Sequence, residues 1–339
     1  MKNQATVPVI GYEGEPGEIT GYYVYPIFSK DTIDYTVLTG DGKTLQEARM
    51  DANLQSNQTL NITQVQVVLF TDETAKHDLY DFLDPFYRFP RNRLTAYPAI
   101  VEGDMADYVD VEKQLSDVLP KYYREIIESS VFSSDIQEVN LQKACTLMFD
   151  KGVDLTLPYF TLDKKGNPKI SGNALFSNNK YTGTYLTHEE SVIFNLMNKS
   201  QGRFSRLSSI WEYKGKEYNL SYDIGKVKRK WKISEVAGKV KLNATYEVDI
   251  TLNEIPLPTY MTVQDLKELE GFLNKSLKKR FTDTFDKMQN AKSDALGIGR
   301  KVRAHHPEIW KKARWHDQYA EMEAEIDVKT TIFSTGILR

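Results

Sequence analysis

The sequence has a single cysteine, Cys145, in 339 residues. One cysteine excludes an internal disulfide and any metal site built from several cysteines. Cys145 lies in a helical pattern with Leu141, Ala144 and Met148. We therefore expect it to be a small apolar residue that is buried in a helix.

Long apolar runs are also missing. The longest covers residues 67–70, whereas a helix that spans a membrane needs about 20 apolar residues. The first six residues have no apolar core of the kind that a secretory signal requires. We therefore expect this chain to be soluble, and a chain trimmed of an N-terminal targeting segment would look the same.

The net charge of the whole chain is only −3, but each half carries an excess of one sign. Residues 1–163 carry 13 Lys and Arg against 26 Asp and Glu, which gives −13, and residues 164–339 carry 31 against 21, which gives +10. Two differently solvated surfaces would explain the asymmetry. The functional alternative is an acidic half and a basic half that face different partners, with the basic half near anionic lipid.

Motifs typical of catalytic sites are absent, since the sequence has no serine elbow, zinc-binding motif or calcium loop. Gly297 and Gly299 enclose one isoleucine after a predicted helix. A phosphate-binding loop precedes a helix, so we expect these glycines to end the helix and not to bind a nucleotide.

The histidines also have structural explanations. His305 and His306 are adjacent and cannot share one face of a helix. With Pro307 at a first helical position and Glu308 in the first turn, they are expected to begin a helix. His188 lies in a helix-capping sequence. We therefore predict no catalytic, cofactor-binding or metal-binding residues, no cofactor and no enzymatic activity.

Residues 1–115 predict an N-terminal domain of sheet and helices. Its expected elements are a hairpin of residues 7–11 and 20–28, a helix capped by Thr44 and Glu47, a buried strand at 65–70, a helix that starts at Asp72 and stops before Pro90, and an extended segment at 94–101. Residues 116–163 predict a middle, largely helical domain or connector, with a loop at 129–135.

Residues 164–339 predict a C-terminal α+β domain. A hairpin is expected around Asn178 and Asn179, because asparagine tolerates the positive φ of a tight turn. Thr187 and Glu190 form a capping box before a helix. From residue 239 to 252, seven apolar side chains alternate with seven polar ones, which is typical of a strand with one buried and one solvated face.

The last third predicts a long helix over residues 263–293, because apolar residues recur every three or four positions. A short basic helix that holds Trp310 and Trp315 follows, and then an alternating strand that ends at Thr335. The predicted fold class is multi-domain α+β, with mixed or antiparallel sheets flanked by helices. In its C-terminal domain the long helix lies across an antiparallel sheet.

Residues 226–232 form a dense basic stretch around Trp231. A solvated edge strand or hairpin is one interpretation, because lysine on an edge prevents unwanted strand pairing. Contact with an anionic membrane is a second. Binding to nucleic acid is a third, although a sequence pI near 6.0 lacks the positive balance that such binding favours, and we predict no nucleic-acid partner.

Three groups of residues carry a family resemblance. The first is residues 291–299 (AKSDALGIG), then 306–311 (HPEIWK) and 334–336 (STG); the second is residues 171–176 (SGNALF) with Lys180, Gly183 and Glu190; the third is residues 42–44 with Glu47, Ala48, Arg88, Arg91, Glu102 and Gly103. Together they resemble the Ger(x)C family, the C-type lipoprotein subunits of bacterial spore germinant receptors, over most of the chain.

The resemblance implies a non-enzymatic subunit of a nutrient germinant receptor that acts in receptor assembly and germination signalling. Members of the family are exported, lipidated on an N-terminal cysteine and held at the outer face of the spore inner membrane. There they associate with integral-membrane A-type and B-type subunits. Cys145 lies in mid-chain and cannot be the lipidated residue. Either this chain is the soluble ectodomain of an anchored lipoprotein, or the inference of an anchor fails.

Two other functional classes stay open. An extracytoplasmic small-molecule binding protein would need an aromatic-lined pocket, for which the 20 tyrosines offer material. A hydrolase of spore-wall material would need a carboxylate pair with one raised pKa, and the sequence has no specific candidate for such a pair.

Overall fold

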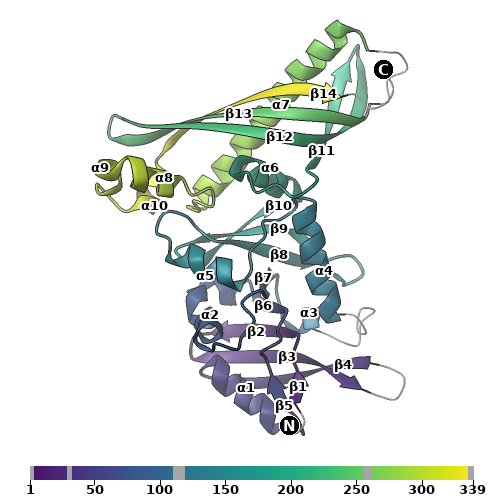
Figure 1. The fold of residues 1–339 in the computed structure, drawn as a ribbon, viewed down its shortest axis with the longest axis vertical. Coiled ribbons are helices and arrows are strands. Elements are labelled where there is room, and N and C mark those ends of the chain that lie inside the picture. The colour runs from purple at the N-terminus through teal and green to yellow at the C-terminus, as the bar shows by residue number, and fades with distance from the viewer. Residues whose placement is uncertain (1–3, 29–32, 110–118, 256–260, 335–339) are drawn as a thin grey trace. The chain divides into compact units, whose positions relative to one another are not determined.

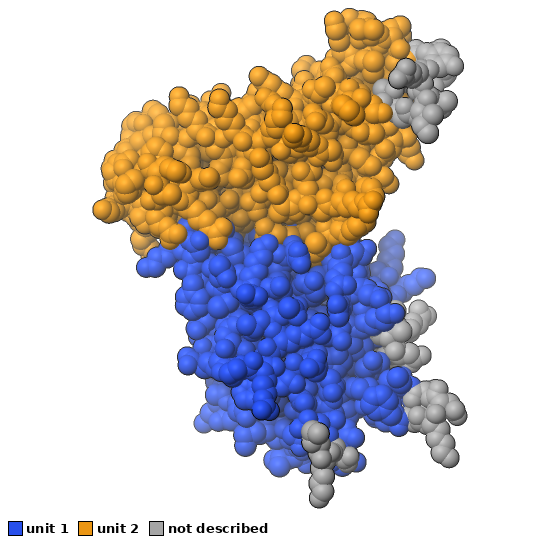
Figure 2. All heavy atoms as spheres, viewed as in Figure 1, with its two compact units in different colours: residues 1–130, 138–185 blue, residues 131–137, 186–339 orange. Residues whose placement is uncertain are grey.

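The computed structural model describes residues 4–28, 33–109, 119–255 and 261–334. The chain divides into two compact units, one of residues 1–130 and 138–185 and the other of residues 131–137 and 186–339 (Figure 2). The division into domains at 1–115, 116–163 and 164–339 stays a prediction. Within the described ranges, no helix is long and apolar enough to cross a membrane.

The first unit is built on an eight-stranded sheet with the order β10-β9-β8-β7-β6-β2-β3-β4 (Figure 1). Its strands are β2 (Val9–Glu15), β3 (Glu18–Phe28), β4 (Ile33–Gly42), β6 (Val67–Thr71), β7 (Tyr97–Val101), β8 (Thr156–Leu162), β9 (Pro168–Ser177) and β10 (Lys180–Thr187). A separate parallel pair joins β1 (Gln4–Thr6) to β5 (Thr59–Asn61).

Both predicted hairpins of this sheet are confirmed. Strands β2 and β3 are antiparallel, with Val9 opposite Val24. Strands β9 and β10 flank Asn178 and Asn179, whose φ values of 49° and 64° are those of the left-handed region. Asparagine is one of the few residues that tolerate this region, so the sequence determines the turn locally.

The centre of the sheet is parallel. Strand β6 pairs in parallel with β2 and β7, and β7 pairs in parallel with β8. Every residue of β6 is buried, as expected for a strand that is covered on both faces. The predicted strands at 65–70 and 94–101 are confirmed as β6 and β7, and their carboxyl ends meet at one edge of the sheet.

The helices that alternate with these strands are α1 (Leu45–Leu54), the 3-10 helix η1 (Thr74–Lys76), α2 (Leu79–Arg88), α3 (Ala106–Val109), α4 (Leu119–Phe132) and α5 (Leu141–Phe149). The predicted cap of α1 is confirmed, because the Glu47 N–H donates to Thr44 Oγ1 at 3.1 Å. The Glu47 carboxylate in turn accepts from the Lys43 N–H at 2.8 Å.

The prediction of one continuous helix from Asp72 was wrong. The 3-10 helix ends at Lys76, His77 is extended, and α2 begins at Leu79. Asp78 accounts for the interruption, because its carboxylate accepts the Tyr80 N–H at 3.0 Å and so caps a new helix.

Two further local predictions were wrong. The expected loop at 129–135 begins only after Phe132, because α4 continues to bury one face there, at Ile127 and Ser130. Cys145 is half-buried rather than buried, since the buried face of α5 consists of Leu141, Ala144 and Leu147.

The second unit is built on a four-stranded sheet with the order β11-β12-β13-β14 (Figure 1). Its strands are β11 (Arg206–Tyr213), β12 (Lys216–Val236), β13 (Lys239–Glu254) and β14 (Glu323–Ser334). The predicted alternation of β13 is confirmed, because Val240, Tyr246 and Leu252 are buried while the residues between the apolar positions face outward.

This sheet is mixed and not wholly antiparallel, because β14 pairs in parallel with β13. The connection between these two strands explains the difference from the prediction. It runs through a long helix, and such a helical crossover carries the chain from the carboxyl end of β13 back to its amino end, where β14 begins beside it.

The predicted long helix is confirmed as α7 (Val263–Asn290). Its apolar stripe packs on the sheet, with the rings of Phe281 and Tyr246 at a centroid distance of 4.9 Å. Six apolar residues of the stripe are fully buried, namely Leu269, Leu273, Leu277, Phe281, Phe285 and Met288. Helix α6 (His188–Asn198) packs against α7.

The predicted single basic helix around Trp310 and Trp315 was wrong. Three short helices occupy this stretch: α8 (Ile298–His305), α9 (Pro307–Trp310) and α10 (Trp315–Ala320). Pro307 has no N–H to continue α8 and instead takes the first position of α9. Arg314 is extended and separates α9 from α10.

Candidate functional site

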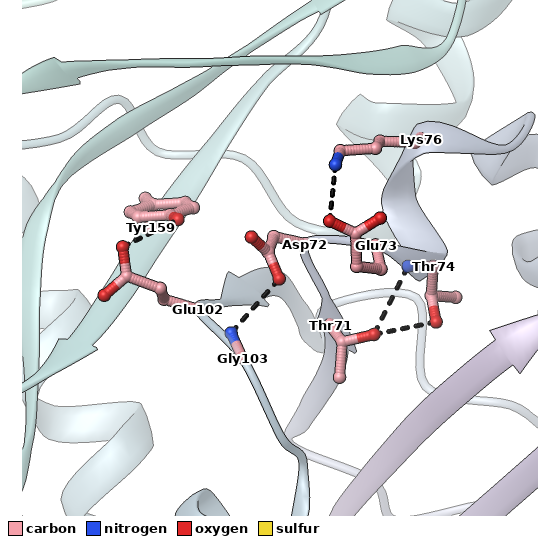
Figure 3. Close-up of polar contacts among 8 residues, drawn as sticks. All are labelled: Thr71, Asp72, Glu73, Thr74, Lys76, Glu102, Gly103 and Tyr159. Carbon is pink, nitrogen blue, oxygen red and sulfur yellow. Dashed lines mark hydrogen bonds and ion pairs between the residues drawn. The ribbon is translucent and has the colours of Figure 1, made fainter.

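The carboxyl ends of β6 and β7 place acidic residues together in the first unit. Asp72 directly follows β6 and Glu102 directly follows β7. Figure 3 shows both carboxylates at the edge where the parallel strands end. Ligands of open α/β sheets commonly bind at such an edge, so it is the first place to look for chemistry.

The loops at this edge hold one another through hydrogen bonds. The Gly103 N–H donates to Asp72 Oδ1 at 3.1 Å, and the Asp72 N–H donates to the Val101 carbonyl at 2.8 Å. Thr71 Oγ1 donates to Thr74 Oγ1 at 2.8 Å and accepts the Thr74 N–H at 3.3 Å (Figure 3). These bonds explain the first turn after β6 without any ligand.

Glu102 is engaged by an aromatic cluster. Tyr159 Oη donates to Glu102 Oε1 at 3.4 Å (Figure 3), and the Tyr159 ring stacks on Tyr185 at a centroid distance of 4.4 Å. Burial raises the pKa of Tyr159 far above its ordinary value, so the phenol stays protonated and remains a donor. The Tyr159 ring also stacks with Tyr181, at a centroid distance of 5.8 Å.

This edge combines carboxylate acceptors with aromatic rings. Among the residues that the structure describes, the Asp72 and Glu102 carboxylates accept from the Gly103 N–H and the Tyr159 hydroxyl, and neither contacts a nucleophile that is hydrogen-bonded to a base, as covalent catalysis requires. Among the residues that the structure describes, no group of three or more His, Cys, Asp or Glu side chains could hold a metal ion. The contacts brace the loops against the sheet.

In the second unit, a buried carboxylate organises the segment after α7. Asp294 is fully buried. Its Oδ1 accepts the Ile298 N–H at 2.9 Å, and its Oδ2 accepts the Gly299 N–H at 2.7 Å and the Trp315 indole N–H at 2.8 Å. An acid at the N-terminus of α8 also interacts favourably with the helix dipole.

The glycine motif therefore has a different role from the predicted one. Helix α7 ends at Asn290, and Lys292 follows with the left-handed φ of 52°. Gly297, with φ 69°, precedes α8 as its N-cap. The expectation that the glycines end the long helix was wrong. The N–H groups of Ile298 and Gly299 are engaged by Asp294, so they are not free for a phosphate.

Several charged residues gather at the start of α6 in the second unit. The capping box predicted at Thr187 and Glu190 is confirmed. His188 Nε2 lies 2.9 Å from Asp135 Oδ1. The next two residues pair with α7, because Glu189 contacts Arg280, and Glu190 Oε2 lies 2.6 Å from Lys287 Nζ.

A hollow of about 860 Å³ lies beside this helix start, and His188, Glu189 and Arg206 are part of its lining. Its charges are already paired, since Arg206 also makes a bidentate contact with Asp223 at 2.8 and 3.0 Å. Paired charges offer little to an incoming charged ligand.

The remaining histidines of interest lie at helix ends, and His306 Nδ1 is 3.7 Å from Glu308 Oε1 in the first turn of α9. His306 is the N-cap of α9 and Pro307 is at its first position, as predicted. His305 is the last residue of α8. Among the described strands, the basic stretch 226–232 pairs with β13 alone, because β11 begins opposite Asp223 and pairs only with residues 216–223 of β12. The interpretation of this stretch as the edge of a hairpin is therefore confirmed.

Two relationships escaped the sequence reasoning. The Asp135–His188 pair joins residues that are 53 positions apart, and only the fold brings them together. Asp294 had a local signal, since it lies in the motif that carries the family resemblance, but its partner Trp315 lies 21 residues away.

Comparisons with known proteins bear on these features. The model of the family described as "Spore germination protein N-terminal domain" matches residues 1–162. The model described as "Spore germination B3/ GerAC like, C-terminal" matches residues 171–336. The two matches follow one another along nearly the whole chain.

Individual relatives agree. Spore germination protein KC of Bacillus subtilis is 23% identical over 326 residues, which cover 89% of this chain and 79% of the relative. Spore germination protein GerQC of Bacillus cereus is 21% identical over 343 residues, which cover 98% and 92%. The solved structure of the GerBC protein has the same fold, with a TM-score of 0.63, 17% identity, and coverage of 93% of this chain and 94% of that one.

The resemblance drawn from the sequence is thus confirmed over both halves of the chain, and the residues that carry it include the buried Asp294 centre. Both domain models of one family match in order, and a solved protein of the same kind shares the fold. The chain belongs to the Ger(x)C family of spore germination proteins, and its role lies in germination.

Proposed function

We propose that this protein is a non-enzymatic subunit of a spore germinant receptor. In this proposal it is the ectodomain of a lipid-anchored protein at the outer face of the spore inner membrane, where it assembles with the integral-membrane A-type and B-type subunits. The observation that carries the proposal is the ordered match of both family domains over the chain.

The geometry of the polar clusters supports a binding rather than a catalytic role. At the β6–β7 edge, the acids accept hydrogen bonds that hold loops in place. At the start of α6, acids and bases cross-link two helices. A protein whose charged groups brace its own loops presents fixed surfaces, and fixed surfaces are what a docking partner recognises with little ordering cost.

Charge supplies the candidate docking surfaces. Lys226, Lys228 and Lys230 are exposed on the β12 half of the hairpin. Exposed acids of the first 138 residues include Asp104, Glu125 and Glu138. Complementary charges at an interface speed association and select partners. We therefore infer that at least one of these two groups contacts the membrane subunits.

Two triple variants test this proposal in spores. One is Lys226→Gln with Lys228→Gln and Lys230→Gln, and the other is Asp104→Asn with Glu125→Gln and Glu138→Gln. Lys216, Lys267 and Lys275 are exposed elsewhere in the second unit, and their triple change to Gln is the matched control.

The measurements are recovery of the membrane subunits with the tagged chain and the rate of nutrient-triggered germination. At least one test variant should reduce both, while the control leaves both unchanged. Unchanged recovery and germination in both test variants would contradict the docking proposal.

A further inference from the structure

A second hollow of the C-terminal unit is lined almost entirely by bases. It has a volume of about 450 Å³ and lies between the β12 hairpin, the end of α6 and the end of α8. Its lining residues are Lys199, Arg229, Trp231, Lys232, Ile233, Lys301, His305 and His306. No carboxylate is among them, in contrast to the hollow beside the start of α6.

The centre of this hollow is held in a fixed geometry. The Arg229 guanidinium lies over the Trp231 ring, with Cζ 4.0 Å from the ring centroid, and Nη1 donates to the Met197 carbonyl at 2.9 Å. The Trp231 indole N–H donates to Tyr246 Oη at 3.0 Å. The aromatic ring and the guanidinium are thus oriented before any ligand arrives, which lowers the ordering cost of binding.

The positive charge of the hollow is not neutralised from within. Among the described residues, Lys199, Arg229, Lys232 and Lys301 form no ion pair, and the one acid close to a lining base is Glu308, whose Oε1 lies 3.7 Å from His306 Nδ1. Burial lowers the pKa of Arg229, as expected for a cation that has lost part of its hydration without gaining a carboxylate.

Arginine has five N–H donors in a planar fork. Among the described interactions of Arg229, the bond to Met197 is its only hydrogen bond. A guanidinium with unused donors matches the oxygens of a phosphate group, and nearby lysines add point charges. The volume is that of a small-molecule site rather than of a lone ion.

We propose that this hollow binds a phosphate-bearing ligand, with Arg229, Lys232 and Lys301 as its cationic contacts. Both a free phosphate compound and the headgroup of an anionic phospholipid carry this chemistry. The inference goes beyond the proposed receptor role, because it concerns the purified chain and requires no partner subunit.

The test uses the full chain and three probes. They are inorganic phosphate, short-chain phosphatidylglycerol below its micelle concentration, and vesicles of phosphatidylcholine with or without phosphatidylglycerol. Calorimetry measures binding of the two soluble probes, and flotation measures binding to vesicles. The test variant is Lys232→Gln with Lys301→Gln, and the control is Lys267→Gln with Lys275→Gln, which removes the same charge from exposed positions of α7.

At least one probe should bind to the unchanged chain, and the test variant should weaken that binding about tenfold or more, since each charge-assisted hydrogen bond contributes a factor of this order. The control should bind as the unchanged chain does. Binding of both soluble probes supports a general phosphate site, and binding of phosphatidylglycerol alone assigns the site to a headgroup.

Two results would overturn the proposal. One is that none of the three probes binds. The other is that the test and control variants lose affinity equally, because binding would then follow the net charge of the protein and not this hollow. Arg229→Lys adds a check on geometry, since it keeps the charge but loses the planar fork. It should weaken phosphate binding while the unfolding transition stays cooperative.

Discussion

The indole N–H of Trp315 donates to Oδ2 of Asp294 at 2.8 Å, across 21 residues of chain. The same carboxylate accepts the N–H groups of Ile298 and Gly299. One buried acid thereby joins the end of the α7 region, the start of α8 and the start of α10. The residues that carry the family resemblance in this region are structural, and they fix three short helices beside the sheet.

Replacing Asp294 should strongly destabilise the second unit. Asp294→Ala leaves three donors without this acceptor, and each unsatisfied buried group costs about 1–3 kcal/mol, so we expect a loss of roughly 3 kcal/mol or more. All four tryptophans lie between residues 211 and 315, so their fluorescence during urea unfolding reports on this unit. Asp283→Ala, at an exposed position of α7, should change stability by no more than about 0.5 kcal/mol. Similar losses in both variants would contradict the structural role of Asp294.

Gly299 should not tolerate a side chain. A Cβ at this position would lie 2.5 Å from Trp315 Nε1 and 2.8 Å from its Cε2, so the indole would have to move away from Asp294. We expect Gly299→Ala to cost about 1–3 kcal/mol, as overpacked cores do.

Gly271 is a matched control on α7, because a Cβ there would meet nothing within 4 Å. Gly271→Ala should be neutral or stabilise by about 0.5–1 kcal/mol, because alanine favours the helix. Urea unfolding compares the two variants. A Gly299→Ala variant as stable as Gly271→Ala would show that the indole is not held as described.

The His188–Asp135 pair should give a pH dependence. The hydrogen bond to Asp135, and to a lesser extent the charge of Glu189, raises the pKa of His188 above its ordinary 6.5. A raised folded pKa contributes stability that is fully present below the unfolded pKa and is lost as pH rises through the folded value. The His188 side chain is 63% exposed, so solvent screening keeps this contribution small.

The direct check is an NMR titration of His188. Its pKa should fall in Asp135→Asn, and the difference in stability between the two chains should shrink as the pH rises above the folded pKa of His188. An unchanged midpoint in the variant would show that the two side chains are not paired in solution.

Asp265 should titrate at an unusually low pH. A hydrogen bond from the Tyr213 hydroxyl, and then bonds from Thr262, lower the pKa of Asp265 from 3.8 to about 2. Its contribution to stability is therefore present above the ordinary carboxyl range and is lost as pH falls toward 2. Tyr213→Phe should raise the pKa of Asp265, as measured by carboxyl carbon shifts. A titration midpoint that stays near 2 in this variant would assign the shift to the helix cap alone.

Local sequence signals predicted much of the fold. The asparagine pair at 178–179, the caps at Thr44 and Thr187 and the alternation of β13 each determine an element through short-range chemistry, and each is confirmed. The wrong helix predictions arose where one residue starts a new helix inside a pattern that otherwise indicates a single helix. Asp78 begins a second helix inside an apolar pattern that reads as continuous, and Pro307 divides a basic stretch that reads as one helix.

Long-range relationships were not predictable from one sequence. The parallel pairing of β14 with β13 depends on how α7 crosses the sheet, and a strand's own alternation is the same in either direction. The basic hollow is another example. Residues 226–232 identify its lysines and Trp231, but Lys199 and Lys301 come from other elements and only the fold adds them.

We propose that this chain acts as a membrane-anchored receptor subunit in germination. The most direct test of this proposal is mass spectrometry of the N-terminus of the protein made from its native gene, combined with fractionation of spores into membrane and soluble pools. The account predicts a lipid-modified N-terminal cysteine on protein in the membrane fraction, together with the A-type and B-type subunits. An unmodified protein that stays in the soluble fraction would contradict it.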